Sequence, residues 1–188
     1  WNPGDGNDTV EGQDGVDSML FFGANIAENI DIVANGGRVL FIRDIANVTM
    51  DLNDVEGIEF RALGGADNIA VGDLSGTDVT KIDLDLRGPN GGGDGEADTI
   101  TVNGTNGDDV FGAAGDSDGV SVFGLQAVVN IFSPEQANAR LTLNALGGND
   151  AVHASSQEAD GLKSSINGGV RKHVQCRYGS DRQAPRTR

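Results

Sequence analysis

The sequence predicts an all-β fold, and three observations lead to this prediction. Short runs that alternate apolar and polar residues recur about every 9–14 residues, as half-buried strands do. Glycine, asparagine or aspartate separates most of these runs, and the 29 glycines among 188 residues are about twice the usual share. A nine-residue period also repeats near the N-terminus. We therefore expect a right-handed parallel β-solenoid or β-roll with short irregular turns, and the alternative is an antiparallel β-sandwich.

The N-terminal residues form two tandem nonapeptides. Residues 3–11 read Pro-Gly-Asp-Gly-Asn-Asp-Thr-Val-Glu, and residues 12–20 read Gly-Gln-Asp-Gly-Val-Asp-Ser-Met-Leu. Glycine permits the positive φ angles of a tight turn, and an apolar residue two places after the aspartate points inward from a short strand. Val10 and Met19 occupy that inward position.

Strand-like runs follow over most of the remaining sequence. Each carries apolar residues at every second position, which places them on one face of a strand. The predicted strands are residues 30–33, 39–42, 48–52, 58–60, 82–86, 99–102, 120–123, 128–131 and 141–143. One short helix is expected to start at residues 133–136, where serine precedes proline and glutamate.

The sequence also contains a longer repeat, which includes several of the short ones. Ala-Leu-Gly-Gly occurs at residues 62–65 and again at 145–148, and about 55 residues from near Gly23 are matched from near Gly104. Duplication suits a solenoid, because each turn contacts only its neighbours. The expected organisation is nonapeptide repeats over 1–22, a degenerate solenoid module over 23–90, a duplicated module over 91–170, and a basic tail over 171–188.

The charge distribution limits the classes of partner. The chain carries a formal charge of −16, with a net −21 over residues 1–170 and a net +5 over the last eighteen residues. This acidity argues against nucleic acid, because phosphate binding needs clustered lysine and arginine. No apolar run reaches the ~20 residues that a membrane span needs. The basic tail is expected to be disordered, and a reading-frame change or cloning scar is the alternative origin for it.

The tandem nonapeptides resemble the RTX-type calcium-binding repeats of bacterial secreted proteins. The resemblance covers residues 3–20 well and residues 92–110 in part. It implies a parallel β-roll, calcium held in the turns, export to the cell exterior or surface, and folding triggered by external calcium. The resemblance implies that the aspartate that binds calcium in each repeat corresponds to Asp8 and Asp17 here, and less directly to Asp98 and Asp108.

Carboxylates dominate the candidate metal ligands. Calcium takes six to eight oxygen ligands in irregular geometry, whereas zinc would need histidine and cysteine at spacings that this sequence lacks. The candidate ligands are Asp5, Asp8, Asp14, Asp17, Asp94, Asp98, Asp108 and Asp109, with turns shaped by Gly4, Gly6, Gly12 and Gly15. The alternative is that such aspartates bond their own backbone without metal, which is favoured for Asp67 and Asp150.

No motif for nucleophilic catalysis, phosphate binding or zinc hydrolysis occurs in the sequence. The sequence therefore predicts a calcium-binding, non-catalytic structural module that stiffens on binding calcium. Two alternatives stay open: a polysaccharide-active enzyme or carbohydrate-binding module, in which carboxylates act on or contact sugars, and an adhesion module.

Overall fold

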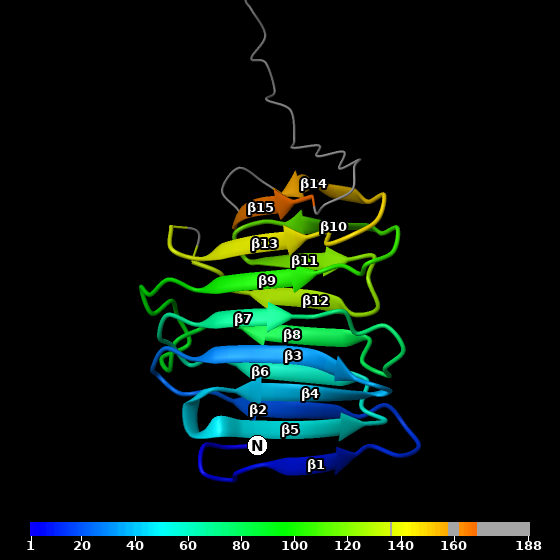
Figure 1. The fold of residues 1–188 in the computed structure, drawn as a ribbon. Coiled ribbons are helices and arrows are strands. Elements are labelled where there is room, and N and C mark those ends of the chain that lie inside the picture. The colour runs from blue at the N-terminus through cyan, green and yellow to red at the C-terminus, as the bar shows by residue number, and fades with distance from the viewer. Residues whose placement is uncertain (136, 158–161, 169–188) are drawn as a thin grey trace, which may run out of the picture.

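The fold consists of two stacked β-sheets, which Figure 1 shows one in front of the other, with the strands piled along the long axis. This computed structural model describes residues 1–135, 137–157 and 162–168. Sheet A contains, in spatial order, β1 (Asp8–Glu11), β5 (Val48–Asn53), β4 (Arg38–Arg43), β3 (Asn29–Asn35), β7 (Asn68–Val71), β9 (Thr99–Asn103), β13 (Arg140–Asn144) and β15 (Lys163–Asn167). Sheet B contains β14 (Ala151–Gln157), β10 (Val110–Gly115), β11 (Gly119–Phe123), β12 (Val128–Phe132), β8 (Lys81–Asp85), β6 (Gly57–Arg61) and β2 (Ser18–Phe22).

Both sheets are mixed. Within the described residues nine strand pairings are parallel, and the four antiparallel ones belong to two meanders, β3–β4–β5 and β10–β11–β12. Outside the meanders, consecutive strands alternate between the sheets, as in the series β6, β7, β8, β9 and β10. The all-β prediction is confirmed, and the two-sheet arrangement is also compatible with the sandwich alternative.

A single hydrophobic core fills the space between the sheets. Every second residue of the strands points inward, so that Ile82 and Leu84 of β8 are fully buried. Met19 is buried and Val10 packs partly buried against the core, which confirms the inward direction expected for both.

Aromatic side chains are concentrated near the N-terminal end of this core. The rings of Phe21 and Phe60 from sheet B meet that of Phe41 from sheet A, with centroids 4.4 Å apart for Phe21–Phe41 and 5.7 Å for Phe41–Phe60. Trp1 stacks on Phe21 at 4.1 Å. Phe21, Phe41 and Phe60 are fully buried, so they tie the two sheets together.

The predicted duplication has a counterpart in the strand order. The strands β2 to β8 correspond to β9 to β15, with starts offset by 80 to 83 residues, and each set contains one antiparallel meander. Corresponding strands lie in opposite sheets, so that β2 belongs to sheet B and β9 to sheet A. We call β2–β8 the first copy and β9–β15 the second copy.

The structure corrects one predicted element. No helix forms at the described residues of 133–139, where a turn joins the amides of Asn138 and Ala139 to the carbonyl oxygen of Glu135 at 3.0 and 2.7 Å. Ser133 has φ +51°, which does not suit a helix cap. The described part of the chain contains only one short 3₁₀ turn, η1 (Ile45–Asn47), and no helix that could span a membrane. The basic tail, 171–188, lies outside the described residues.

Candidate functional site

A carboxylate recurs at one position of the strand pattern. It comes two residues before the first inward apolar side chain of a strand, where a turn ends and extended backbone begins. Asp8, Asp17, Glu28, Glu56, Asp67, Asp98, Asp109 and Asp150 all occupy this position. For Asp109 the inward residue is Phe111, which is buried, whereas the neighbouring Val110 is exposed.

Parallel pairing brings several of these carboxylates together, because adjacent parallel strands begin at the same edge of a sheet. Seven of the eight fall into three groups, which we call the carboxylate stacks. They are Asp17 with Glu56, then Glu28 with Asp67 and Asp98, and finally Asp109 with Asp150. Figure 1 shows that the parallel-paired strands of one sheet start on the opposite side from those of the other, so the middle stack lies away from the other two.

Each stack is held by backbone amides. In the middle stack the amide of Glu28 donates to Oδ1 of Asp67 at 2.9 Å, and the amide of Asp67 donates to Oδ1 of Asp98 at 3.0 Å. The amide of Asp109 donates to Oδ1 of Asp150 at 3.0 Å in the same manner. The carboxylates therefore continue the hydrogen-bond ladder past the ends of the strands.

In the first stack the accepting side chain is a glutamate. The amide of Asp17 donates to Oε2 of Glu56 at 2.7 Å, and the carbonyl oxygen of Asp17 accepts from the amide of Gly57. The longer glutamate accepts from the backbone amide of Asp17, as an aspartate accepts from an amide in the other stacks.

Three stack members carry a buried oxygen without a hydrogen-bond partner among the described residues. These atoms are Oδ2 of Asp17, Asp67 and Asp150. The side chains of Asp67 and Asp150 are almost wholly buried, with 1% and 2% of each residue exposed. Buried polar atoms are normally bonded, so each of these oxygens retains an unused acceptor.

Burial also changes the acidity of the middle stack. It raises the pKa of Asp67 to about 8, and the nearby Asp98, Glu28 and Asp94 carboxylates act in the same direction. Burial likewise raises the pKa of Asp98 to about 6, with Asp94 and Glu135 adding to the effect. The charged form of the Asp67 carboxylate is therefore disfavoured at neutral pH when no cation is bound.

These shifts predict a pH dependence of stability. Between about pH 4 and pH 8 the folded chain holds a proton on Asp67 that the unfolded chain has released, so the free energy of unfolding falls as the pH rises. In EDTA, urea unfolding should give a stability higher at pH 5 than at pH 8, by on the order of a few kcal/mol. Asp67→Asn should remove most of that difference, while Asp78→Asn, a change at an exposed carboxylate, should retain it. An unchanged slope in Asp67→Asn would refute this assignment.

The one fully buried ion pair of the described residues closes the middle stack. The guanidinium of Arg43 donates through Nε to Oε1 of Glu28, and both side chains are at least 96% buried. Oε2 of Glu28 accepts from the amide of Ala24 at 2.9 Å, and the guanidinium lies 5.8 Å from the centroid of the Trp1 ring. Glu28 is therefore satisfied from within the protein.

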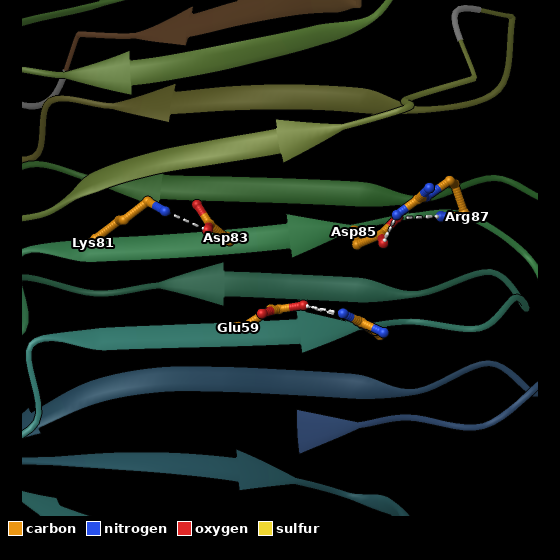
Figure 2. A network of polar contacts seen from close by, with 6 residues as sticks. Glu59, Lys81, Asp83, Asp85 and Arg87 are labelled. Atoms are coloured by element: carbon orange, nitrogen blue, oxygen red, sulfur yellow. Dashed lines mark hydrogen bonds and ion pairs between the residues drawn. The ribbon is translucent and has the colours of Figure 1, made fainter. Parts of the chain in front are cut away.

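Carboxylates outside the stacks also have basic partners. Figure 2 shows Lys81 with Asp83 and Asp85 with Arg87 along β8, at 2.6 and 2.5 Å. Burial alone would raise the pKa of Asp85, but the hydrogen bonds from Arg87 hold that pKa below its usual value. None of the eight predicted metal ligands forms such an ion pair with a described residue.

The predicted ligands occupy separate environments. Asp8 and Asp14 are exposed, and Asp5 accepts from the amide of Asn2 at 2.8 Å. Asp17, Asp98 and Asp109 belong to three different stacks. Asp94 accepts from the amide of Gly65 at 2.6 Å and Asp108 from that of Asn149 at 2.8 Å, each one loop away.

The predicted turn glycines fit their role. Gly4, Gly6 and Gly15 have φ angles of +110°, +83° and +147°. A Cβ on Gly12 would lie 1.6 Å from the carbonyl oxygen of Asp54, so the backbones there meet too closely for any side chain.

Some stack members were not among the predicted ligands. The sequence favours plain turns for Asp67 and Asp150, and it does not point to Glu28, to Glu56 or to Arg43, the partner of Glu28, as site residues. The shared spacing of a carboxylate two places before an apolar residue is the signal that identifies the acidic members. Over the described ranges, no three His, Cys, Asp or Glu side chains are arranged to hold a metal ion. Comparison of the chain with protein-family models, curated proteins and solved structures finds no match.

Proposed function

We propose that this chain is a calcium-binding structural module of a secreted or surface protein, in which divalent cations neutralise the carboxylate stacks and stiffen the two sheets. The observation that carries the proposal is the set of buried, unpartnered oxygens on Asp17, Asp67 and Asp150. Each is an acceptor with no donor among the described residues, in a chain whose net charge is −16. Calcium prefers carboxylate and carbonyl oxygens and tolerates irregular geometry.

Electrostatics support the same proposal. The raised pKa of Asp67 measures how unfavourable its negative charge is without a counter-ion. A divalent cation beside the stack would favour the charged form and offset the repulsion among neighbouring carboxylates. Calcium at the ~1 mM found outside cells would substantially fill even weak sites of 10⁻⁴–10⁻³ M affinity.

The finer architecture belongs to this proposal. We propose that the parallel pairings, with strands alternating between sheets, form a right-handed β-roll of the RTX type, interrupted once per copy by an antiparallel meander. The parallel registers of β3 with β7 and of β7 with β9 support it, since they superpose Ile30, Ile69 and Ile100 in one inward row.

Calcium should raise the melting temperature of the chain. When the free calcium concentration is 100 times the Kd of a site, binding adds about 2.7 kcal/mol to the free energy of unfolding. For a chain of this size that corresponds to a rise in melting temperature on the order of 5–10 °C. Melting followed by circular dichroism, with calcium, with magnesium and with EDTA, measures this shift. Magnesium should give a smaller shift, because it demands near-octahedral geometry.

A matched pair of variants tests where calcium acts. The triple change Asp17→Asn, Asp67→Asn and Asp150→Asn should abolish most of the calcium shift. A control triple at exposed carboxylates outside the stacks, Asp31→Asn, Asp78→Asn and Asp118→Asn, removes the same charge and should retain the shift. Equal shifts in the two triples would show that calcium acts only through net charge, and no shift in the wild-type chain would refute calcium binding.

A further inference from the structure

The two copies differ beside one carboxylate, where side chains fill the space in the first copy and a cavity lies in the second. Their buried residues correspond at a constant offset of 81 through the meander: Met19 matches Ile100, Phe21 matches Val102 and Val39 matches Val120. The same offset relates Glu28 to Asp109, so the surroundings of these two carboxylates can be compared directly.

The two carboxylates share one backbone hydrogen bond, and the Thr105 hydroxyl additionally donates to Asp109 at 3.0 Å. The amide of Ala24 donates to Glu28 at 2.9 Å, and the amide of Thr105 donates to Asp109 at 2.7 Å. A Cβ on Gly23 would meet the Glu28 carboxylate, and a Cβ on Gly104 would meet that of Asp109. The turn before the carboxylate is therefore similar in both copies.

The groups that cover the two carboxylates do not match. In the first copy Arg43 pairs with Glu28 beneath the Trp1 ring. The residue that matches Arg43 is Gly124, whose φ is +100° and whose Cβ would lie 2.4 Å from the carbonyl oxygen of Val110. No side chain can project from this position, so the second copy cannot supply its own guanidinium there.

The residue in the place of Trp1 is also smaller in the second copy. Trp1 lies beside β2, where its carbonyl oxygen accepts from the amide of Phe22 at 3.2 Å. Val71 lies in the same relation to β9, paired with Val102. The space that indole and guanidinium fill in the first copy is thus open in the second.

A cavity of about 190 Å³ occupies this space. Its walls include the side chains of Val71, Val102 and Val129, and its charged residues are Asp73 and Asp109. No lysine, arginine or histidine is among the residues that line it. The cavity therefore combines valine side chains and uncharged polar groups, such as those of Asn103 and Gln126, with negative charge, as a site for an organic cation does.

We propose that this cavity binds a guanidinium group carried by a short alkyl chain, with the Asp109 carboxylate in the role that Glu28 plays toward Arg43. The planar guanidinium makes charge-assisted hydrogen bonds to a carboxylate, and its alkyl chain packs on the valine walls. This activity is additional to the proposed structural role and does not depend on calcium.

A metal ion fits the cavity less well. Both oxygens of Asp109 accept from Thr105, and Oδ1 of Asp73 accepts from the amide of Ser75 at 2.9 Å. Asp73 and Asp109 are the two carboxylates among the described lining residues, whereas calcium draws on six to eight oxygen ligands. A guanidinium requires only one well-placed carboxylate and tolerates apolar contact along its stem.

Two-dimensional ¹H–¹⁵N NMR of the full chain tests the proposal, with ethylguanidinium as the probe, in EDTA and again in calcium. We expect saturable shifts at the amides of Gly124 and Gln126 in both buffers. N-ethylurea, a neutral analogue of the same shape, should bind at least about tenfold more weakly, because it lacks the charge that Asp109 recognises. Asp109→Asn should weaken ethylguanidinium binding by a similar factor, while Asp108→Asn, the same change one residue away, should not.

A second variant keeps the carboxylate and fills the space. Val71→Trp places in the second copy the residue that lies in the matching position of the first, and it should abolish the shifts if the cavity is the site. Equal binding of ethylguanidinium and N-ethylurea, or unchanged affinity in both Asp109→Asn and Val71→Trp, would overturn the proposal. Saturable shifts of the same amides by calcium but not by ethylguanidinium would also overturn it, in favour of a metal site.

Discussion

Phe60→Ala should lower the free energy of unfolding by about 3–5 kcal/mol. Phe60 is fully buried, and its ring lies 5.7 Å from Phe41 of the opposite sheet and 6.1 Å from Phe21 of its own. Truncation to alanine leaves a void that neighbouring side chains, fixed on strands, cannot fill. The loss of stability is therefore the sum of the lost hydrophobic transfer free energy and the lost packing contacts. Urea unfolding monitored by circular dichroism measures the change.

Two control variants separate packing from bulk hydrophobicity. Phe60→Leu should lose less stability, because Leu143 fills the matching position of the second copy and is fully buried there. Phe132→Ala removes a ring that is 43% exposed and should change stability by no more than about 0.5 kcal/mol. A loss in Phe132→Ala as large as in Phe60→Ala would contradict the placement of the core.

Arg43→Ala should be about as damaging, with a loss of about 3–5 kcal/mol. The variant removes the guanidinium from Glu28, whose carboxylate then stays buried without its counter-charge. The loss arises mainly because the Glu28 charge is left buried and unpaired. The attraction between Arg43 and Glu28 contributes less, because the cost of removing both charges from water already offsets much of it. Thermal and urea unfolding at neutral pH both measure it.

The double variant decides between these two causes. Glu28→Gln keeps an oxygen that can accept from the amide of Ala24, so Arg43→Ala combined with Glu28→Gln should recover a large part of the loss. Additive losses in the double variant would mean that the two side chains act independently, against the buried pair described here.

Strand positions could be predicted because their information is local. Ile82 and Leu84 alternate with Asp83 and with Asp85, and this period of two is sufficient to place a strand with one buried face. Local pattern is insufficient near Val110. A carboxylate role for Asp108 would put Val110, two places later, in the inward position, but Val110 is exposed and Phe111 is buried. Because Val110 and Phe111 are both apolar, the alternating pattern does not indicate which of them points inward.

The site was less predictable because it depends on partners far apart in the sequence. Asp67 accepts from an amide 39 residues earlier, and its own amide donates to a residue 31 positions later. Those pairings follow from which strands lie side by side. The order of strands in the sheets is hard to read from the sequence, because two antiparallel meanders interrupt the parallel pairings. The pairing of Arg43 with Glu28 depends on the first of these meanders, which folds β4 back beside β3.

The exchange of sheets between the two copies has a consequence for longer arrays. Each copy contributes seven strands, an odd number, so the equivalent strand of the next copy falls on the other sheet. Successive copies are thus related by a half-turn about the long axis combined with a translation, as on a two-fold screw. Any lateral feature that a copy carries would alternate between opposite flanks of the rod, and two partners bound to adjacent copies would face away from each other without steric conflict.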